Sequence, residues 1–525
     1  MNSRKVILVF ACLTMFTGHA FSQTQYEAAR LSGSELDGTA RFVSMGGAMS
    51  ALGADISTIS TNPAGIGLFR SSEVSVTGGL NVTKTESNFG GYTANDRRTT
   101  ASFDQVGFVC STKIGNRTSL RYVNFAFNYH KSKNFNRNFR SEGYLGGLSQ
   151  TQQMANMMAD AIDDISEVDD IYDYWSGSGN PYSPTGSNYP YLGVMGVRTE
   201  LVAVSSDESS LIGWNGDYSR YISREEGGVD EYDFNVAFNV DDRLYIGATI
   251  GVFDVDYKLS TYYTEDIYDG DDEGYYEHCN WFRTEGVGVD FKFGIIVRPV
   301  EESPFRIGLS VHTPTWYTLT DSYCSDMYSY INYSGEDTFE AEEYTPDYVG
   351  GNVYTDYKLR TPWKFNVSAG TTFGNKVAVG AEYEFADYGS SKLYYDNGDE
   401  IYTQNQYIKE DLKAMHTVRV GMEARCTPEF TVRVGYNYST SGYEKTAYKA
   451  LNWNDMRTDT EYSNNRDRHV VTAGIGYRKN SFTVDLAYKY DLLQQDFYAF
   501  SADDLNASKV DNERHQLLMT LGMKF

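Results

Sequence analysis

The stretch FTVRVGYNYST, residues 430–440, alternates apolar or aromatic side chains with polar or small ones at every second position. Val434 would share one face of a strand with the residues two positions away, and Arg433 would point to the opposite face. The stretches SFTVDLAYKY, residues 481–490, and HQLLMTLGMKF, residues 515–525, repeat this pattern. Because successive side chains of a β-strand point to opposite faces, the period predicts half-buried strands.

Segments of this kind follow one another from residue 72 onward, and we count about fourteen. They lie near residues 72–88, 100–114, 120–133, 232–240, 244–263, 284–300, 304–318, 363–373, 376–392, 412–427, 429–440, 466–478, 481–496 and 513–525. The short connections between them are 115–119, 241–243, 301–303, 374–375, 428 and 479–480. The long ones include 134–231, 264–283, 319–361 and 440–465.

This alternation of short and long connections decides between two all-β folds. Bacterial outer-membrane barrels have short turns on one side and long loops on the other, and an even strand number places both termini on the short-turn side. A soluble β-sandwich also alternates, but it gives no reason for this spacing. We therefore predict a transmembrane antiparallel β-barrel of about fourteen strands over residues 72–525, with the long connections outside the cell.

The composition agrees with an outer-membrane protein. The 525 residues carry a formal charge of −26, which excludes a nucleic-acid partner because phosphate binding needs clustered Lys and Arg. The chain has 44 Tyr and 48 Gly but only 10 Pro, as expected of a large β structure. A last strand ending on Phe525 is typical of chains recognised by the outer-membrane assembly machinery, which we expect as a partner during biogenesis.

The first 22 residues predict a cleaved export signal. Arg4 and Lys5 are basic, residues 6–16 are apolar, and small residues precede a cleavage site after Ser22. The alternative is a lipoprotein acylated at Cys12, but the apolar region before Cys12 is then very short. We expect a multi-pass protein of the bacterial outer membrane.

Residues 23–71 do not alternate and predict a plug. Apolar residues at Met45, Met49 and Leu52 predict a short helix before a turn at Pro63. This segment could hang in the periplasm as a polar arm. A barrel of about fourteen strands, however, has a lumen wider than the eight-stranded barrels that side chains alone can fill. We therefore place the segment inside the lumen.

The stretch GGAMSALGADISTISTNPAGIGLF, residues 46–69, resembles the N-terminal hatch of the FadL/TodX family of outer-membrane transporters for hydrophobic compounds. Asn62, Pro63 and Ala64 match the Asn-Pro-Ala motif of that family, and Gly65 follows them. Residues 377–393, 430–439 and 469–490 resemble its later strands. The hatch and the last third of the chain carry the resemblance, and the middle carries little of it.

The resemblance implies a monomeric, plugged barrel that passively transports hydrophobic small molecules such as long-chain fatty acids. The ligand would be captured by extracellular loops, enter the lumen, and leave sideways through the wall into the lipid of the outer membrane. In this family the wall opens where strand three bends inward near the Asn-Pro-Ala turn, so Asn62, Pro63, Ala64 and Gly65 become gate residues. Strand three here, residues 121–131, contains neither Gly nor Pro to mark such a bend.

Residues 148–165 predict an amphipathic helix in the longest loop. Met154, Met157, Met158 and Ile162 lie on one face, and flexible methionines suit a ligand of variable shape. The alternative is that this face only packs the loop onto the barrel rim. The loop at 134–231 has sixteen acidic and five basic residues, a field that would repel a free carboxylate and favours a neutral ligand or surface divalent cations. The basic residues nearest to the strand are Arg137 and Arg140.

Other chemistries find little support. No Cys-x-x-Cys or close His pair is present, so we predict no metal site, no cofactor and no enzyme, although His130 or His312 could in principle serve as a base. Cys279 and Cys324 could form a disulfide, while Cys110 and Cys426 fit small wall positions. The acidic run 269–274 lacks the Glu that an EF-hand needs at its twelfth position. We expect a salt-bridged lumen wall from Glu382, Glu384, Arg419, Glu423, Arg425, Arg433 and Asp485.

Two other functions remain open at this stage. A FadL-like barrel could serve as a surface-protein or secretion partner, or as a binding module, through its long Tyr-rich loops. A hydrophilic diffusion porin would conduct ions steadily, which a plugged barrel would not.

Overall fold

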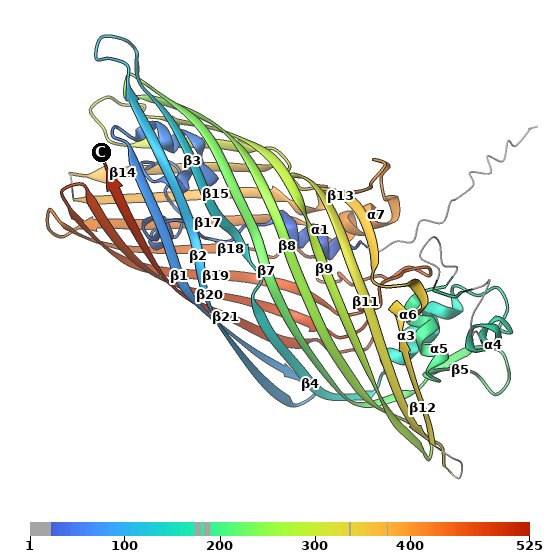
Figure 1. Ribbon diagram of the computed structural model, residues 1–525. Helices are drawn as coiled ribbons and strands as arrows, with labels where there is room; N and C mark the ends of the chain where they lie inside the picture. Colours follow the sequence, from blue (N-terminus) through green and yellow to red (C-terminus); the bar gives the residue numbers. More distant parts are fainter. Residues whose placement is uncertain (1–22, 174–179, 183–188, 335–337, 375) are drawn as a thin grey trace, which may run out of the picture.

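A computed structural model describes residues 23–525 except for 174–179, 183–188, 335–337 and 375, so the predicted signal peptide, residues 1–22, lies outside the described residues. The main sheet closes on itself, because β1 pairs with both β2 and the last strand, β21 (Figure 1). The strands are β1 Glu73–Phe89, β2 Tyr92–Lys113, β3 Leu120–Asn134, β4 Arg137–Gly147, β5 Val202–Val204, β6 Leu211–Gly213, β7 Asn215–Val240, β8 Leu244–Asp269, β9 Asp272–Val297, β10 Arg306–His312, β11 Trp316–Asn332, β12 Thr338–Tyr344, β13 Val353–Arg360, β14 Lys364–Phe373, β15 Val377–Asp387, β16 Lys392–Tyr395, β17 Ala414–Arg425, β18 Phe430–Ser439, β19 Tyr462–Lys479, β20 Phe482–Tyr498 and β21 Ser508–Lys524.

The closed sheet is a barrel of fourteen antiparallel strands. The sheet has 19 strand segments, and four of them continue another segment: β4 extends β3, β11 extends β10, β16 extends β15, and β14 continues β13. A fifth, β12, is an added segment that pairs with β11, so fourteen strands remain. The short strands β5 and β6 form a separate ribbon. The predicted fold class is confirmed.

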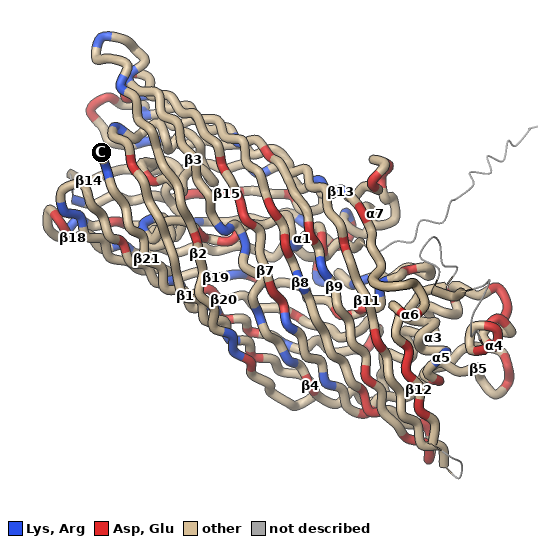
Figure 2. Tube along the Cα trace, in the orientation of Figure 1, with Lys and Arg blue, Asp and Glu red and all other residues tan. Residues whose placement is uncertain are grey.

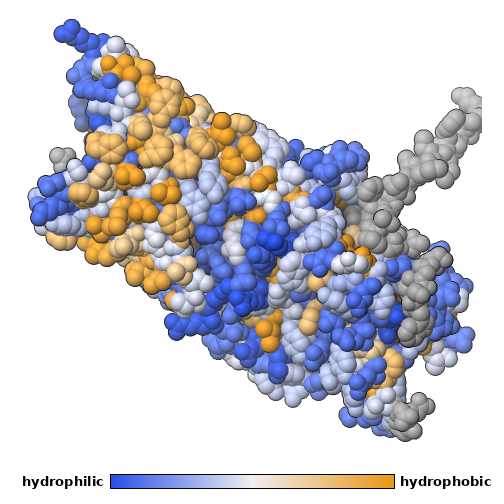
Figure 3. Space-filling view, in the orientation of Figure 1, coloured by the Kyte–Doolittle hydropathy of each residue, from blue (hydrophilic) through white to orange (hydrophobic). Residues whose placement is uncertain are grey.

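Alternation places apolar side chains outside the barrel and polar ones inside. On β18, Val432 and Val434 are 44% and 51% exposed, while Arg433 between them is 6% exposed. Figure 3 shows apolar residues gathered over the end of the barrel that carries the C-terminus. Such a band is what a lipid-facing wall requires. Among the described residues, no helix is both long and apolar enough to cross a membrane.

Several strands run far beyond this band. β7, β8 and β9 have 26 residues each, whereas about 9–11 residues suffice to cross a bilayer. The long loops predicted at 264–283 and 319–361 are therefore wrong, because β8 turns directly into β9 and β11 to β13 occupy most of the second range. Their outer faces are polar, so the apolar pattern that marked the other strands is missing. The connection at 440–465 has no strand until β19 begins at Tyr462.

Helices cover the far end of the barrel. The cap consists of α3 Gln150–Ala159, α4 Glu167–Tyr172, α5 Tyr191–Arg198 and α6 Thr345–Val349, together with β5 and β6 (Figure 1). The short helix η3 Tyr388–Ser390 and α7 Tyr402–Asp411 follow β15. Acidic residues crowd α4 and β12 in Figure 2, as the charge of the predicted long loop implies.

The N-terminal segment lies inside the barrel. It comprises α1 Gln25–Ser32, α2 Ala40–Ser44 and the 3₁₀ helices η1 Ile56–Ser60 and η2 Pro63–Leu68. Its helix α2 contacts β18 to β21, and η2 contacts β3 and β7 to β9. The helix predicted through Met45 to Leu52 is wrong, because Gly46 and Gly47 adopt positive φ values that end α2 and turn the chain. The buried side chains of that stretch therefore sit on turns.

Candidate functional site

The Asn-Pro-Ala turn is seated on the inner wall of β7 to β10. Asn62 caps η2 by accepting a hydrogen bond from the backbone N–H of Ala64 (3.1 Å), and its Nδ2 donates to the carbonyls of Ile295 and Leu309 at 3.3 and 3.4 Å. Glycines make room for it: a Cβ added at Gly294 would lie 2.0 Å from Asn62 Oδ1. The seat is thus specific for the turn, although strand three, where the resemblance placed the gate, is not its main support.

Strand three carries a β-bulge near the point where the resemblance placed the inward bend. The pairing of β2 with β3 ends at Gln105 and His130, and the register of β3 against β7 shifts between Lys131 and Lys133. At this point the carbonyl of Ser132 accepts a hydrogen bond from the backbone N–H of Glu35 in the N-terminal segment (2.9 Å). A β-bulge without Gly or Pro therefore supplies the bend that the sequence did not mark.

A cavity of about 300 Å³ lies in the lumen between α1 and the mouth of the barrel. Eight basic and six acidic side chains line it, although the chain as a whole is strongly acidic. The basic ones are Arg30, Lys133, Arg137, Lys449, Arg457, Arg466, Arg468 and Arg514, and the acidic ones are Glu27, Glu35, Glu225, Asp459, Glu461 and Asp491. Nine aromatic residues add apolar wall: Tyr26, Phe135, Phe139, Tyr221, Tyr257, Tyr388, Tyr443, Tyr462 and Phe497. The chamber thus offers both ring faces and positive charge.

The helix α1 is tied to the loop after β18. Arg457 of that loop contacts Glu27 at 3.0 Å and Asp459 at 2.5 Å, and all three are buried. Burial opposes the charge of Glu27, but Arg457 and Arg30 outweigh it and lower the pKa of this carboxyl to about 2. Tyr26 adds a hydrogen bond to Asn464 (2.8 Å). The top of the plug is therefore held by charged contacts.

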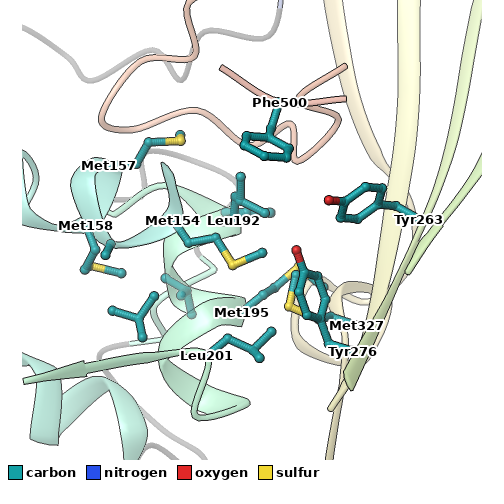
Figure 4. Close-up of a cluster of buried hydrophobic side chains, with 14 of the residues drawn as sticks. Met154, Met157, Met158, Leu192, Met195, Leu201, Tyr263, Tyr276, Met327 and Phe500 are labelled. Carbon is teal, nitrogen blue, oxygen red and sulfur yellow. The ribbon is translucent and has the colours of Figure 1, made fainter. Parts of the chain in front are cut away.

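The predicted Met-rich face lies in the apolar core of the cap (Figure 4). The helix α3 ends at Ala159, earlier than expected, and Met154, Met157 and Met158 are buried, while Ile162 packs partly against the same cluster. Met195, Met327 and Phe500 come to this cluster from other elements (Figure 4). The burial fits the alternative in which the face packs the loop, so a ligand would have to displace these side chains.

The predicted charged wall is largely present. Arg433 bridges Glu423 (2.7 Å) and Asp485 (2.6 Å), and Arg41 of the plug also contacts Glu423 (2.9 Å). Arg419 pairs with Glu382 and Glu384, at 2.6 and 3.1 Å. Arg425 does not belong to it, because it is exposed near a short turn.

The described residues contain one group whose side chains could hold a metal ion: His130, Glu231 and Asp233. Lys292 bonds to both carboxylates and so already supplies a cation to them. His312 lies apart from this group and contacts the carbonyl of Thr61 at 3.0 Å. An ion network within the wall accounts for His130, Glu231 and Asp233, and a hydrogen bond to the plug accounts for His312.

The structure also shows where the cysteines, the acidic run and the two arginines singled out from the sequence lie. Cys279 and Cys324 lie on neighbouring strands with free thiols, and Cys110 and Cys426 are free and exposed. The acidic run 269–274 forms the tip of the β8–β9 hairpin. Arg140 contacts Asp96 at 3.6 Å and does not line the lumen cavity, whereas Arg137 does.

A second hollow, of about 840 Å³, lies on the outer wall of β2, β3 and β7 to β10. Aromatic side chains dominate it, among them Phe108, Phe125, Phe234, Phe291 and Phe293. Asn235, which also borders it, donates to the carbonyl of Pro63 at 3.4 Å. The hollow therefore lies behind the seat of the Asn-Pro-Ala turn, on the other side of the same strands.

We compared the fold of the chain with solved structures. A Pseudomonas aeruginosa FadL homologue matches with a TM-score of 0.51 and 12% identity, over 94% of this chain and 99% of that one. The chain has the fold of a FadL-type barrel. The Pseudomonas putida toluene transporter TodX matches with a TM-score of 0.45, at 12% identity over 94% of this chain and all of that one. The monoaromatic hydrocarbon channel CymD matches with a TM-score of 0.44, at 12% identity over 94% and 98%.

Two comparisons of the amino-acid sequence found no match. No family model and no curated protein sequence matches this chain. The FadL-type fold is therefore established by structural similarity alone.

Two parts of the site escaped sequence reasoning. The helix α1 had a local signal, because Thr24 and Glu27 form a capping box that stabilises its start. The basic lining of the cavity had none, because its members come from α1, several strands and the loop after β18.

Proposed function

We propose that the protein is a passive outer-membrane channel for hydrophobic small molecules of the long-chain fatty acid kind. The observation that carries the proposal is the lumen cavity, which lies between α1 of the plug, the loop after β18 and the barrel wall and is lined by aromatic rings and basic groups. Ligand pockets are concave, largely apolar and given a few polar groups that fix orientation. An apolar molecule with a polar or anionic end fits such a chamber.

The ligand would reach the chamber through the cap. The acidic cap surface would repel a free carboxylate, so a neutral or cation-paired ligand enters more readily. Met154, Met157, Met158 and Ile162 would then rearrange around it, since methionine side chains adapt to different shapes. This step supposes that the cap core opens.

The ligand would leave through the wall. Asn62, Pro63, Ala64 and Gly65 act in this proposal as the gate, because they close the lumen opposite the outer hollow of β7 to β10. The bulge of β3 next to that hollow weakens the wall on the same side. The proposal keeps the division into a signal peptide at 1–22, a plug at 23–71 and a barrel at 72–525.

The test combines ligand identification with transport. We expect mass spectrometry of organic extracts of the detergent-purified protein to find a fatty acid or another apolar compound in stoichiometric amount. Uptake of a fluorescent fatty acid by vesicles containing the protein should fall in a Gly294→Val variant, whose side chain collides with Asn62. Gly78→Val is the matched control, because a Cβ there meets only the carbonyl of Ser102 at 3.5 Å.

An empty lumen together with unchanged uptake in Gly294→Val would overturn the proposal. That outcome would favour the alternative, a FadL-like barrel acting as a surface-protein or secretion partner or as a binding module. One observation favours the alternative: β8 and β9 carry the exposed tyrosines Tyr268 and Tyr275 far from the apolar band. A stable protein partner retained through purification would support it.

A further inference from the structure

Three tyrosine–histidine pairs occupy the outer wall of the barrel's last third. The hydroxyls of Tyr383, Tyr436 and Tyr488 lie 2.8, 2.8 and 2.7 Å from the Nδ1 atoms of His416, His469 and His515. Each tyrosine is 37–45% exposed, and each imidazole is half-buried. The other three histidines after residue 22, His130, His278 and His312, are buried.

The pairs repeat one arrangement. Each pair joins two neighbouring antiparallel strands whose connecting segment lies at the cap end of the barrel: β15 with β17, β18 with β19, and β20 with β21. The residue directly opposite each histidine is a second aromatic two positions after the tyrosine, namely Phe385, Tyr438 and Tyr490. The ring centroids of these residues lie 5.5, 5.2 and 5.2 Å from the imidazoles. Three independent occurrences indicate a shared role.

All three histidines mark the same level, the edge of the apolar band. On β21 the outward residues after His515 are Leu517, Met519 and Leu521, which are 52%, 48% and 45% exposed. Val418 and Val471 follow His416 and His469 in the same way. In the other direction the outward side chains become acidic, as at Asp467 and Glu513. The histidines therefore stand where the hydrocarbon of the membrane ends.

Each imidazole has one nitrogen left to donate. If the tyrosine hydroxyl donates to Nδ1, the proton of the neutral ring is on Nε2; if the ring is charged, both nitrogens carry protons. Within the described part of the chain, no hydrogen bond is made by the Nε2 atoms of these three rings. The Nε2 atom of His515 is buried, with the Glu513 carboxylate at 3.8 Å, so only His416 and His469 can offer this donor to the membrane. A donor at this depth needs an oxygen from the lipid or from water.

We propose that the imidazoles of His416 and His469 are binding sites for the acyl-ester carbonyl oxygens of outer-leaflet lipids. Ester carbonyls are the first acceptors above the hydrocarbon, which is the level at which these N–H groups stand. Phosphate is the weaker candidate, because Asp467 and Glu513 flank the histidines on the side where the headgroups lie and would repel it. Tyr383 and Tyr436 hold the rings of His416 and His469 at the outer wall, and these two sites fix the depth of this wall in the membrane.

The experiment removes the ester carbonyl oxygens from the lipid and leaves the phosphatidylcholine headgroup unchanged. Protein labelled with ¹⁵N at histidine is placed in nanodiscs of a diester phosphatidylcholine, and in nanodiscs of its diether analogue, which has no ester carbonyls. We expect the Nε2 resonances of His416 and His469 to shift between the two lipids, and that of His515, whose Nε2 is buried, to stay unchanged. Those of His130, His278 and His312 should not shift, since these rings are buried.

Two variants separate binding from folding. The triple variant Tyr383→Phe, Tyr436→Phe and Tyr488→Phe keeps the rings but removes the hydroxyls, and we expect it to lose most of the shift while retaining a folded barrel. The triple variant His416→Phe, His469→Phe and His515→Phe should melt at the same temperature in both lipids, whereas the unaltered protein should melt higher in the ester lipid. Tyr477→Phe, in an exposed aromatic without a histidine partner, serves as the control. Equal Nε2 resonances of His416 and His469 in ester and ether lipid would overturn the proposal and assign the donors to water or phosphate.

Discussion

The two ends of the plug are held in different ways. At its lower end the backbone presses against glycines of the wall: a Cβ at Gly380 would lie 2.0 Å from the carbonyl of Ala48, and one at Gly421 would lie 2.2 Å from that of Met45. At its upper end α1 depends on buried charges, with Glu27 paired to Arg457. Close packing therefore holds the lower end of the plug, and a buried ion pair holds the upper end.

The difference indicates which end can move. A close-packed interface loses its contacts only as a whole, because interiors have little free volume. A buried ion pair is sensitive to the loss of a single partner, which leaves the other charge uncompensated. We therefore expect α1 to detach while the Asn62 turn and the segment around Ala48 stay in place.

The largest effect is expected from Arg457→Met. Removing one partner of a buried ion pair costs about 3–5 kcal/mol, so protection of the α1 amides against hydrogen exchange should fall at least about a hundredfold. The amides of α2 should keep theirs. The control is Arg425→Met, the same substitution at an exposed residue that forms no ion pair among the described residues. Equal protection of α1 in both variants would contradict the charge-held upper end.

A smaller effect is expected from Gly294→Val at the lower end. The added side chain collides with Asn62 and cannot be accommodated without moving the turn, and overpacking of this kind costs about 1–3 kcal/mol. Exchange should increase at residues 62–68 and remain unchanged at α1. Simultaneous release of both ends would show that the plug moves as one body.

A still smaller effect is expected from Asn62→Ala. The variant loses the cap of η2 and two hydrogen bonds to the wall, which together amount to about 1–2 kcal/mol. We expect a modest rise in the ion conductance of single channels, and none in Asn88→Ala at the tip of the β1–β2 hairpin. A conductance as large as that of an open porin would mean that Asn62 alone holds the plug.

The smallest effect is expected from acidification between pH 8 and 5. The pKa of Glu27 falls from 4.5 to about 2 in the fold, so its contribution is complete above about pH 4.5 and is lost only as the pH drops toward 2. Burial raises the pKa of Asp455, in the same loop, to about 7, so lowering the pH through 7 stabilises the loop slightly. Hydrogen exchange of α1, corrected for the intrinsic pH dependence, should stay flat or slow down. Release of α1 near pH 6 would contradict this.

The fold was open to prediction wherever one face of a strand is apolar. Val432, Val434 and their counterparts mark the barrel because the lipid demands alternation on the outer wall. Beyond the band the outer faces of β8 and β9 are polar, so the same backbone geometry left no hydrophobic pattern in the sequence. The sequence therefore predicted only the near parts of these 26-residue strands, and their far ends, within residues 264–283, were predicted as a loop.

The site was predictable only in its local parts. Asn62 and Pro63 form a turn whose cap and sequence motif lie within a few residues. The ion pair of Arg457 with Glu27 joins residues 430 positions apart, and the sequence around each residue contains no signal that predicts the other. The bend of β3 comes from a bulge in ordinary residues, which composition does not reveal.

The length of β7, β8 and β9 determines which molecules can reach the cap. At about 3.3 Å per residue, 26 residues span roughly 85 Å, against about 30 Å for the hydrocarbon core. Even with a tilt of about 45°, the hairpin tip stands tens of ångströms above the lipid. These strands hold the cap well away from the lipid, so a macromolecule can bind the cap without contacting the membrane.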